Sequence, residues 1–136
     1  MDFSTSMAVA AAGLKAQSDR MKTIAENIAN ANSAASTAGG DPYRRKVPTM
    51  TSSFDRELNA EVVKSGKPVA DSSEFRMQYD PGNPLADKQG YVKLPNVNSL
   101  VEIMDMREAQ RSYEADLSVI DATKTMLSRT VDLLKK

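Results

Sequence analysis

The sequence predicts a mainly α protein whose long N- and C-terminal helices pair through a coiled-coil seam, with a β-hairpin region between them. Large apolar residues recur every seven positions near both ends of the 136-residue chain, which is the spacing of a helix face that packs on another helix. All six prolines lie between these two segments. Leu, Ile, Val and Phe make up only about a fifth of the chain, so we expect it to need partners to bury enough apolar surface.

The composition excludes most kinds of catalytic or metal centre. The chain has no cysteine and no histidine, which removes disulfides, thiolate nucleophiles, the most common general base and the most common transition-metal ligand. Its 18 basic and 18 acidic side chains cancel, so no nucleic-acid partner is expected. We therefore assign no catalytic, cofactor-binding or metal-binding residue and no cofactor. An enzyme that uses carboxylates is kept as an alternative, and it would require a concave site.

The N-terminal segment does not have the pattern of a signal peptide or of a membrane span. Residues 7–14 are uncharged, but Asp2 precedes them and the first basic residue, Lys15, follows them, which reverses the charge order of a cleaved signal. A membrane-spanning helix requires roughly 20 apolar residues. We expect no direct membrane insertion, and we expect any export to use a route without a cleaved signal.

Residues 4–31 predict the first helix, because they contain no proline and only one glycine. Ser4 or Thr5 is the expected N-cap, since a side-chain hydroxyl can accept a hydrogen bond from an amide of the first turn. Ile24 lies in an offset position beside the main apolar row. That row consists of Met7, Leu14, Met21 and Ile28.

Residues 99–134 predict a second helix, roughly 54 Å long at about 1.5 Å per residue. Ser99 and Glu102 have the spacing of a capping box. Two rows of spacing seven follow, with polar interruptions that favour a particular register or partner. The first row is Met106, Tyr113, Ile120, Leu127 and Leu134, and the second is Ile103, Gln110, Leu117, Lys124 and Val131.

The two helices allow two interpretations. They could belong to an ordinary small bundle, or they could pair with each other and leave further faces for neighbouring subunits. We favour the second interpretation, because two helices share a single seam and bury little surface alone. The expected seam joins one side of the first helix (Leu14, Met21, Ile24, Ile28) to one side of the second (Tyr113, Leu117, Ile120, Leu127).

Residues 33–98 predict an extended region that contains a β-hairpin. Alternating side chains at 58–62 and 75–79 indicate two strands, and residues 65–68 have the composition of a turn between them. The basic run 44–46 is interpreted as a solvated loop, with contact to an acidic partner as the alternative. The segment 80–87 contains two aspartates and two prolines. It is interpreted as a rigid turn, with a hard-cation site or a proline-rich ligand motif as alternatives.

Several motifs resemble a known family. The segment 12–30, AGLKAQSDRMKTIAENIAN, is similar to the N-terminal signature of the bacterial flagellar axial proteins, which form the rod, the hook and the hook-associated structures. The segment 80–87, DPGNPLAD, together with GYV at 90–92 and PNVN at 95–98, resembles the members that form the proximal rod. The segments 39–44 and 111–115 resemble the same members. The resemblance covers essentially the whole chain, and it is weakest over 47–75.

The resemblance implies a structural, non-enzymatic component of the flagellar basal body that serves motility. Residues 1–32 and 99–136 would form one inner-core domain as an antiparallel coiled coil, and 33–98 an extended β-hairpin arm. The implied partners are the rod proteins FlgB, FlgF and FlgG, the rod adaptor FliE, the MS-ring protein FliF and the flagellar type III export apparatus. The implied location is the periplasmic rod, where helical assembly would transmit torque.

The candidate residues form two groups, one on the helices and one in the middle region. The expected assembly interface consists of Leu14, Met21, Ile24, Asn27, Ile28, Asn30, Ile103, Met106, Tyr113, Leu117, Ile120 and Leu127. The arm and turn motif consists of Asp80, Pro81, Pro84, Asp87, Gly90, Tyr91, Pro95 and Asn96. Asn27 and Asn30 match the axial signature and are expected to make polar contacts near the helix end, with ordinary helix-end hydrogen bonding as the alternative.

A competing functional class shares the same heptad rows. A small soluble helical adaptor or chaperone would act as a discrete oligomer, and it would be folded and of fixed size in solution. A rod component would instead complete its packing only in the assembly.

Overall fold

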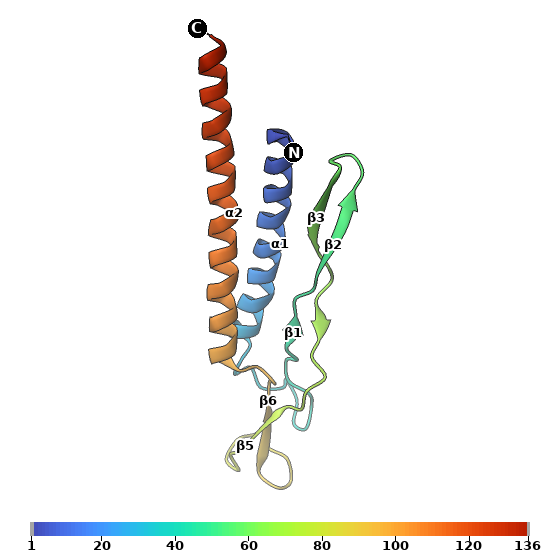
Figure 1. The fold of residues 1–136 in the computed structure, drawn as a ribbon. Coiled ribbons are helices and arrows are strands. Elements are labelled where there is room, and N and C mark those ends of the chain that lie inside the picture. The colour runs from blue at the N-terminus through green and yellow to red at the C-terminus, as the bar shows by residue number, and fades with distance from the viewer. Residues whose placement is uncertain (1, 136) are drawn as a thin grey trace. The chain divides into compact units, whose positions relative to one another are not determined.

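The computed structural model describes residues 2–135 and contains, within them, two long helices joined by a strand-rich middle region (Figure 1). Helix α1 spans Phe3–Ala29 and helix α2 spans Ser99–Leu134. The strands are β1 (Lys46–Val47), β2 (Met50–Asp55), β3 (Ala60–Ser65), β4 (Val69–Ala70), β5 (Arg76–Tyr79) and β6 (Tyr91–Leu94). Both predicted helices are confirmed, and the mainly α class is confirmed in part, since a strand-rich region lies between them.

The caps of both helices differ from those predicted. Ser6 donates its amide hydrogen to the carbonyl of Asp2, and α1 begins at Phe3, so neither Ser4 nor Thr5 is the N-cap. The side chain of Asn98 accepts hydrogen bonds from the amides of Leu100 and Val101, at 3.1 and 3.4 Å. Asn98 is therefore the N-cap of α2, and the predicted capping box is wrong because the Glu102 side chain has other partners.

The middle region forms three antiparallel strand pairs, β1 with β4, β2 with β3 and β5 with β6. The β2–β3 register runs from Met50 opposite Ser65 to Asp55 opposite Ala60. The hairpin turn thus lies at residues 56–59, where Asn59 has a φ of 48°, a conformation that asparagine tolerates. Asp55 accepts the amide hydrogens of the two residues that follow Arg56.

This pairing corrects the predicted hairpin. The segments 58–62 and 75–79 do not pair with each other, since β3 pairs with β2 and β5 pairs with β6. Residues 65–68, predicted as the hairpin turn, instead lie where β3 ends and the chain continues to β4. Gly66 donates its amide hydrogen to the carbonyl of Thr49, across the open end of the β2–β3 hairpin.

The chain forms two compact units, and both helices contribute to each. The first unit consists of residues 1–21, 49–67 and 107–136, and the second of 22–48 and 68–106. In the first unit, Arg20 pairs with Glu108 at 3.5 Å, and Gly13 lies beside the carboxylate of Asp116. The two helical segments of this unit therefore pass each other in opposite directions.

The buried rows of the helices are not the predicted ones. On α2 the buried residues Glu102, Ala109 and Thr123 share a spacing of seven, whereas Leu117 and Leu127 are 40 % and 44 % exposed. The prediction that these two leucines lie in a seam within the chain is therefore wrong. The period was correct but the row was not, because small side chains allow two helices to approach more closely than leucines do.

Helix α1 shows the same preference for small side chains. Its buried residues are Ala10, Ala16, Thr23, Ile24 and Asn27, and Ala31 just beyond its end is also buried. Of the predicted apolar row, Leu14, Met21 and Ile28 are half-buried, and only the offset Ile24 is fully buried. Among the described residues, neither helix is long and apolar enough to cross a membrane.

Candidate assembly interface

Asn27 connects α1 with the segment that leads into β1. Its side chain is fully buried, with 0 % exposure. The amide nitrogen donates to the carbonyl of Lys46 at 2.8 Å and to the carboxylate of Glu102 at 3.1 Å. The amide oxygen accepts from the backbone of Lys46 at 2.9 Å and from the hydroxyl of Tyr43 at 2.8 Å. All four hydrogen-bonding positions of the side chain are thus used.

Glu102 accepts a second hydrogen bond, from Arg45, in addition to the one from Asn27. Arg45 donates its Nε hydrogen to the buried Glu102 carboxylate at 2.5 Å. Its guanidinium also lies 3.3 Å from Asp71 and 3.9 Å from Asp105. Burial would lower the pKa of Arg45, but the hydrogen bonds and charges of Glu102 and Asp71 outweigh it and raise the pKa. Arg45 is therefore held in its charged form.

The neighbours of Arg45 also have partners within the second unit. Arg44 donates to the carbonyls of Asp71 and Ser73 at 2.8 and 3.0 Å, and its guanidinium lies 4.2 Å from the centre of the Phe75 ring. Lys46 pairs with Glu26 at 3.0 Å. The interpretation of 44–46 as a solvated loop is therefore wrong. The acidic groups that it contacts belong to this chain.

Asn30 has a different role from Asn27. Its side-chain amide donates to the carbonyl of Glu26 at 2.8 Å, and its side-chain oxygen accepts from the hydroxyl of Ser33 at 3.4 Å. Both contacts are local to the end of α1. Ordinary helix-end hydrogen bonding thus describes Asn30, whereas Asn27 joins three separate segments of the second unit.

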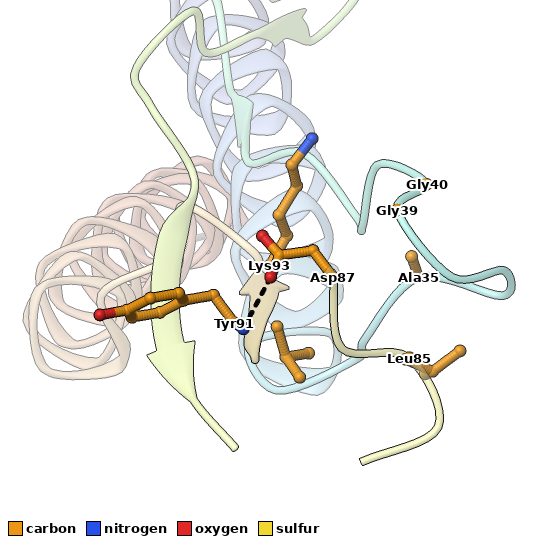
Figure 2. Close-up of a pocket in the computed structure, with 8 residues that line it drawn as sticks. Ala35, Gly39, Gly40, Leu85, Asp87, Tyr91 and Lys93 are labelled. Carbon is orange, nitrogen blue, oxygen red and sulfur yellow. Dashed lines mark hydrogen bonds between the residues drawn. The ribbon is translucent and has the colours of Figure 1, made fainter. Parts of the chain in front are cut away.

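The segment between β5 and β6 is a turn that is held by its own aspartates. Asp87 accepts the amide hydrogens of Gln89 and Tyr91 at 2.8 and 2.9 Å, and the second of these bonds is drawn in Figure 2. The bond from Tyr91 is the main reason that the pKa of Asp87 is lowered. Asp80 accepts from the side-chain amide of Asn83 at 3.3 Å. The rigid-turn interpretation of 80–87 agrees with this geometry.

The other residues of the arm and turn motif position the turn and the chain that follows it. Gly90 has a φ of +85°, and the rings of Tyr79 and Tyr91 meet edge to face at 5.2 Å. Pro81 and Pro84 are exposed, whereas Pro95 is buried. Asn96 accepts the amide hydrogen of Arg45 at 2.8 Å, so this motif is tied directly to the Arg45 cluster.

The hollow beside this turn offers little room. It has a volume of about 20 Å³ and is lined by Gly39, Gly40, Tyr91 and Lys93 among others (Figure 2). Such a volume holds about one water molecule. Among residues 2–135, no group of three or more histidine, cysteine, aspartate or glutamate side chains is arranged to hold a metal ion.

The Asn27–Arg45–Glu102 cluster was only partly visible in the sequence. The motif around Asn27 points to this cluster, whereas local patterns predict a cap for Glu102 and a solvated loop for Arg45. A signal for Glu102 was its place in the row 102, 109, 116 and 123, which is otherwise made of small or short side chains. A long carboxylate in a closely packed row requires a charged partner.

The comparisons with known proteins decide the family. Residues 7–34 match the family described as flagella basal body rod protein, and residues 88–133 match the family described as flagellar basal body rod FlgEFG protein C-terminal. The flagellar basal-body rod protein FlgC of Agrobacterium fabrum is 50 % identical over 98 % of this chain and 96 % of its own length. The chain belongs to the FlgC family.

More distant relatives agree with this assignment. The FlgC proteins of Aquifex aeolicus and Bacillus subtilis are 38 % and 37 % identical, over 99 % and 96 % of this chain and 99 % and 97 % of their own lengths. As a FlgC-family protein, the chain is a structural component of the flagellar basal-body rod. A discrete soluble adaptor or chaperone is not favoured.

One carboxylate in the first unit predicts a pH dependence. Burial raises the pKa of Asp116, so the folded state binds this proton more tightly than the unfolded chain does. Ionised Asp116 therefore destabilises the folded chain when the pH is above the pKa of Asp116 in the folded state. This effect disappears as the pH falls below the pKa of Asp116 in the unfolded chain. Asp116→Asn is expected to raise the melting temperature at pH 7 and to leave it unchanged near pH 3.

The matched control for this prediction is Asp121→Asn, which changes an exposed carboxylate on the same helix and should leave the melting temperature within error at both pH values. Thermal melts followed by circular dichroism measure both variants. A lower melting temperature for Asp116→Asn at pH 7 would contradict the burial argument.

Proposed function

We propose that this FlgC-family chain forms the proximal part of the rod in the periplasm, where it assembles with itself and with other rod proteins through its terminal helices. The observation that carries the proposal is the exposure of large apolar side chains along α2. Ile103, Leu117, Leu127, Val131 and Leu134 are all exposed within the chain. Apolar surface on this scale is typical of a protein whose contacts are completed by neighbouring subunits.

In this proposal, the two predicted apolar rows of α2 contact neighbouring chains. The small and polar row of α2 packs within the chain, so the leucine-rich rows are available to neighbours. We propose that residues 1–32 and 99–136 of each chain pair as an antiparallel coiled coil and form the inner core of the rod, packed against the same segments of neighbouring chains. Residues 33–98 would form the arm that braces them. The partners proposed are FlgB, FlgF, FlgG, the adaptor FliE, the ring protein FliF and the type III export apparatus.

The Asn27–Arg45–Glu102 cluster supports a mechanical role. It ties the base of the arm to both helices through buried hydrogen bonds and an ion pair. Buried polar groups that are fully paired hold a unique arrangement, because any displacement leaves a donor or acceptor without a partner. A subunit that transmits torque requires such a stiff joint between arm and helices.

Leu117→Asp tests the proposal. Because Leu117 is 40 % exposed in the chain, the substitution is expected to lower the free energy of unfolding by only about 1 kcal/mol, through lost helix propensity and lost apolar burial. In the rod, the same change would bury an unpaired charge between subunits. We expect recovery of the chain in isolated basal bodies, and swimming, to fall at least about tenfold.

Ser118→Asp provides the matched control, since it introduces the same charge at the adjacent exposed position outside the two apolar rows. It is expected to leave basal bodies and swimming close to the wild type. If Leu117→Asp cells build normal rods and swim normally, the proposed assembly face is wrong.

A further inference from the structure

A groove runs along the first unit between α1, α2 and β3. Its volume is about 550 Å³, which is large enough for several side chains of another helix. Most of its lining is small or apolar. The apolar lining residues are Val9, Ala10, Gly13, Val63, Ala115 and Val119. The small side chains make the floor shallow, so a helix could approach it closely.

One buried oxygen beside this groove has no donor within residues 2–135, and one carboxylate lines the groove. The side-chain oxygen of Gln17 is buried and, among residues 2–135, accepts no hydrogen bond. Asp116 also lines the groove, and burial alone raises the pKa of its carboxyl group. An apolar groove with one carboxylate is complementary to an apolar helix that carries lysine or arginine.

The end of α2 is such a helix. Since Gly13 lies opposite Asp116 and Arg20 opposite Glu108, the start of α1 lies opposite about residue 126. Beyond that point α2 continues without α1 beside it, as Figure 1 shows. Leu133 and Leu134 are 75 % and 82 % exposed there. We call residues 126–135 the tail; its charged residues are Arg129, Asp132 and Lys135, so it carries one net positive charge.

We propose that the tail of one copy of this chain docks into the groove of a second copy. The tail cannot enter the groove of its own chain, because both lie on one continuous helix: residues 112–119 line the groove, and the tail extends away from it along the same axis. The groove that a tail can enter is therefore that of a second copy. The apolar side chains of the tail would cover the small residues of the groove. One of its basic residues would pair with the Asp116 carboxylate.

This contact has a consequence for the assembly. Each chain has one groove and one tail, so the contact is head-to-tail and leaves a free groove and a free tail at the two ends. Such a contact gives an open array or a ring rather than a closed dimer. The proposal rests on the proposed rod function and adds to it which two surfaces of neighbouring copies meet.

Disulfide trapping in isolated basal bodies tests the contact, because the natural chain has no cysteine. A full-length chain with Val9→Cys and Leu133→Cys, expressed in place of the natural copy, has one cysteine in the groove and one in the tail. After oxidation we expect a ladder of cross-linked multimers on a non-reducing gel. Neither single variant should produce a ladder.

The matched control combines Leu133→Cys with Ser118→Cys, which lies on the same stretch of α2 but does not line the groove. We expect at least about tenfold less multimer from it. A second pair, Ala115→Cys with Leu134→Cys, samples the same contact at other positions. If both groove pairs give no more multimer than the control, or if the groove cysteine links instead to a different protein, the docking proposal is wrong.

The same preparation separates the two proposals. Basal bodies that contain the wild-type chain but yield no groove-to-tail ladder overturn the docking contact and leave the rod function intact. Basal bodies that lack the wild-type chain altogether overturn the rod function itself.

Discussion

Replacing Glu102 by Gln is expected to lower the free energy of unfolding by about 3 kcal/mol. Both oxygens of this fully buried carboxylate accept hydrogen bonds, one from Arg45 and one from Asn27. Glutamine keeps the shape but offers a single oxygen, so its amide hydrogens would face one of these two donors. The charge that balances the half-buried guanidinium is lost at the same time. Urea unfolding followed by circular dichroism measures the difference.

A surface ion pair supplies the control for this prediction. Arg20 and Glu108 are 3.5 Å apart, and the Glu108 side chain is exposed. Exposed ion pairs contribute little to the free energy of unfolding, because water screens the charges and two long side chains must be ordered. Glu108→Gln is therefore expected to cost less than about 0.5 kcal/mol. If the two variants lose similar amounts of stability, the Glu102 cluster does not hold the second unit together.

The heptad pattern predicted both helices but not the row that is buried. A spacing of seven fits every row of a helix equally well, so the choice among rows depended on side-chain size. That criterion predicts burial of Leu117 and Leu127, because large apolar residues usually pack inside. The row that contains Ala109 and Thr123 is buried instead. In the proposed assembly this exception to the usual rule has a reason, since the exposed leucines would make contacts with neighbouring chains.

The charged cluster could not be predicted from local patterns. Ser99 and Glu102 have the spacing of a capping box, and such short motifs occur by chance as well as by function. The three-dimensional position of Arg45, 57 residues away from Glu102 in the sequence, decides what Glu102 does. Asn98 then caps α2 in place of Ser99. Long-range ion pairs of this kind leave no periodic signal, so only the motif around Asn27 pointed to the site.

Replacing Asn27 by Asp is expected to cost about 4 kcal/mol at neutral pH. Aspartate has nearly the same shape as asparagine but has no amide hydrogens, so the carbonyl of Lys46 loses its donor. The hydrogen bond from Asn27 to Glu102 is also lost, because an aspartate oxygen would take the place of the amide nitrogen, 3.1 Å from the Glu102 carboxylate. Two buried like charges at this separation repel strongly. Urea unfolding at pH 7 and pH 4 is the measurement, and the loss should be smaller at pH 4, where one carboxylate can be protonated.

The double variant Asn27→Asp with Glu102→Gln shows whether the two side chains act through their direct contact. The glutamine amide can donate to the new aspartate, so the hydrogen bond between positions 27 and 102 is restored with its direction reversed. The Lys46 carbonyl still lacks its donor, and recovery is therefore partial. We expect the double variant to be more stable than the sum of the single losses predicts, by at least about 1.5 kcal/mol. Simple additivity would mean that each residue acts through its other partners, and that α1 and α2 are not joined by this hydrogen bond.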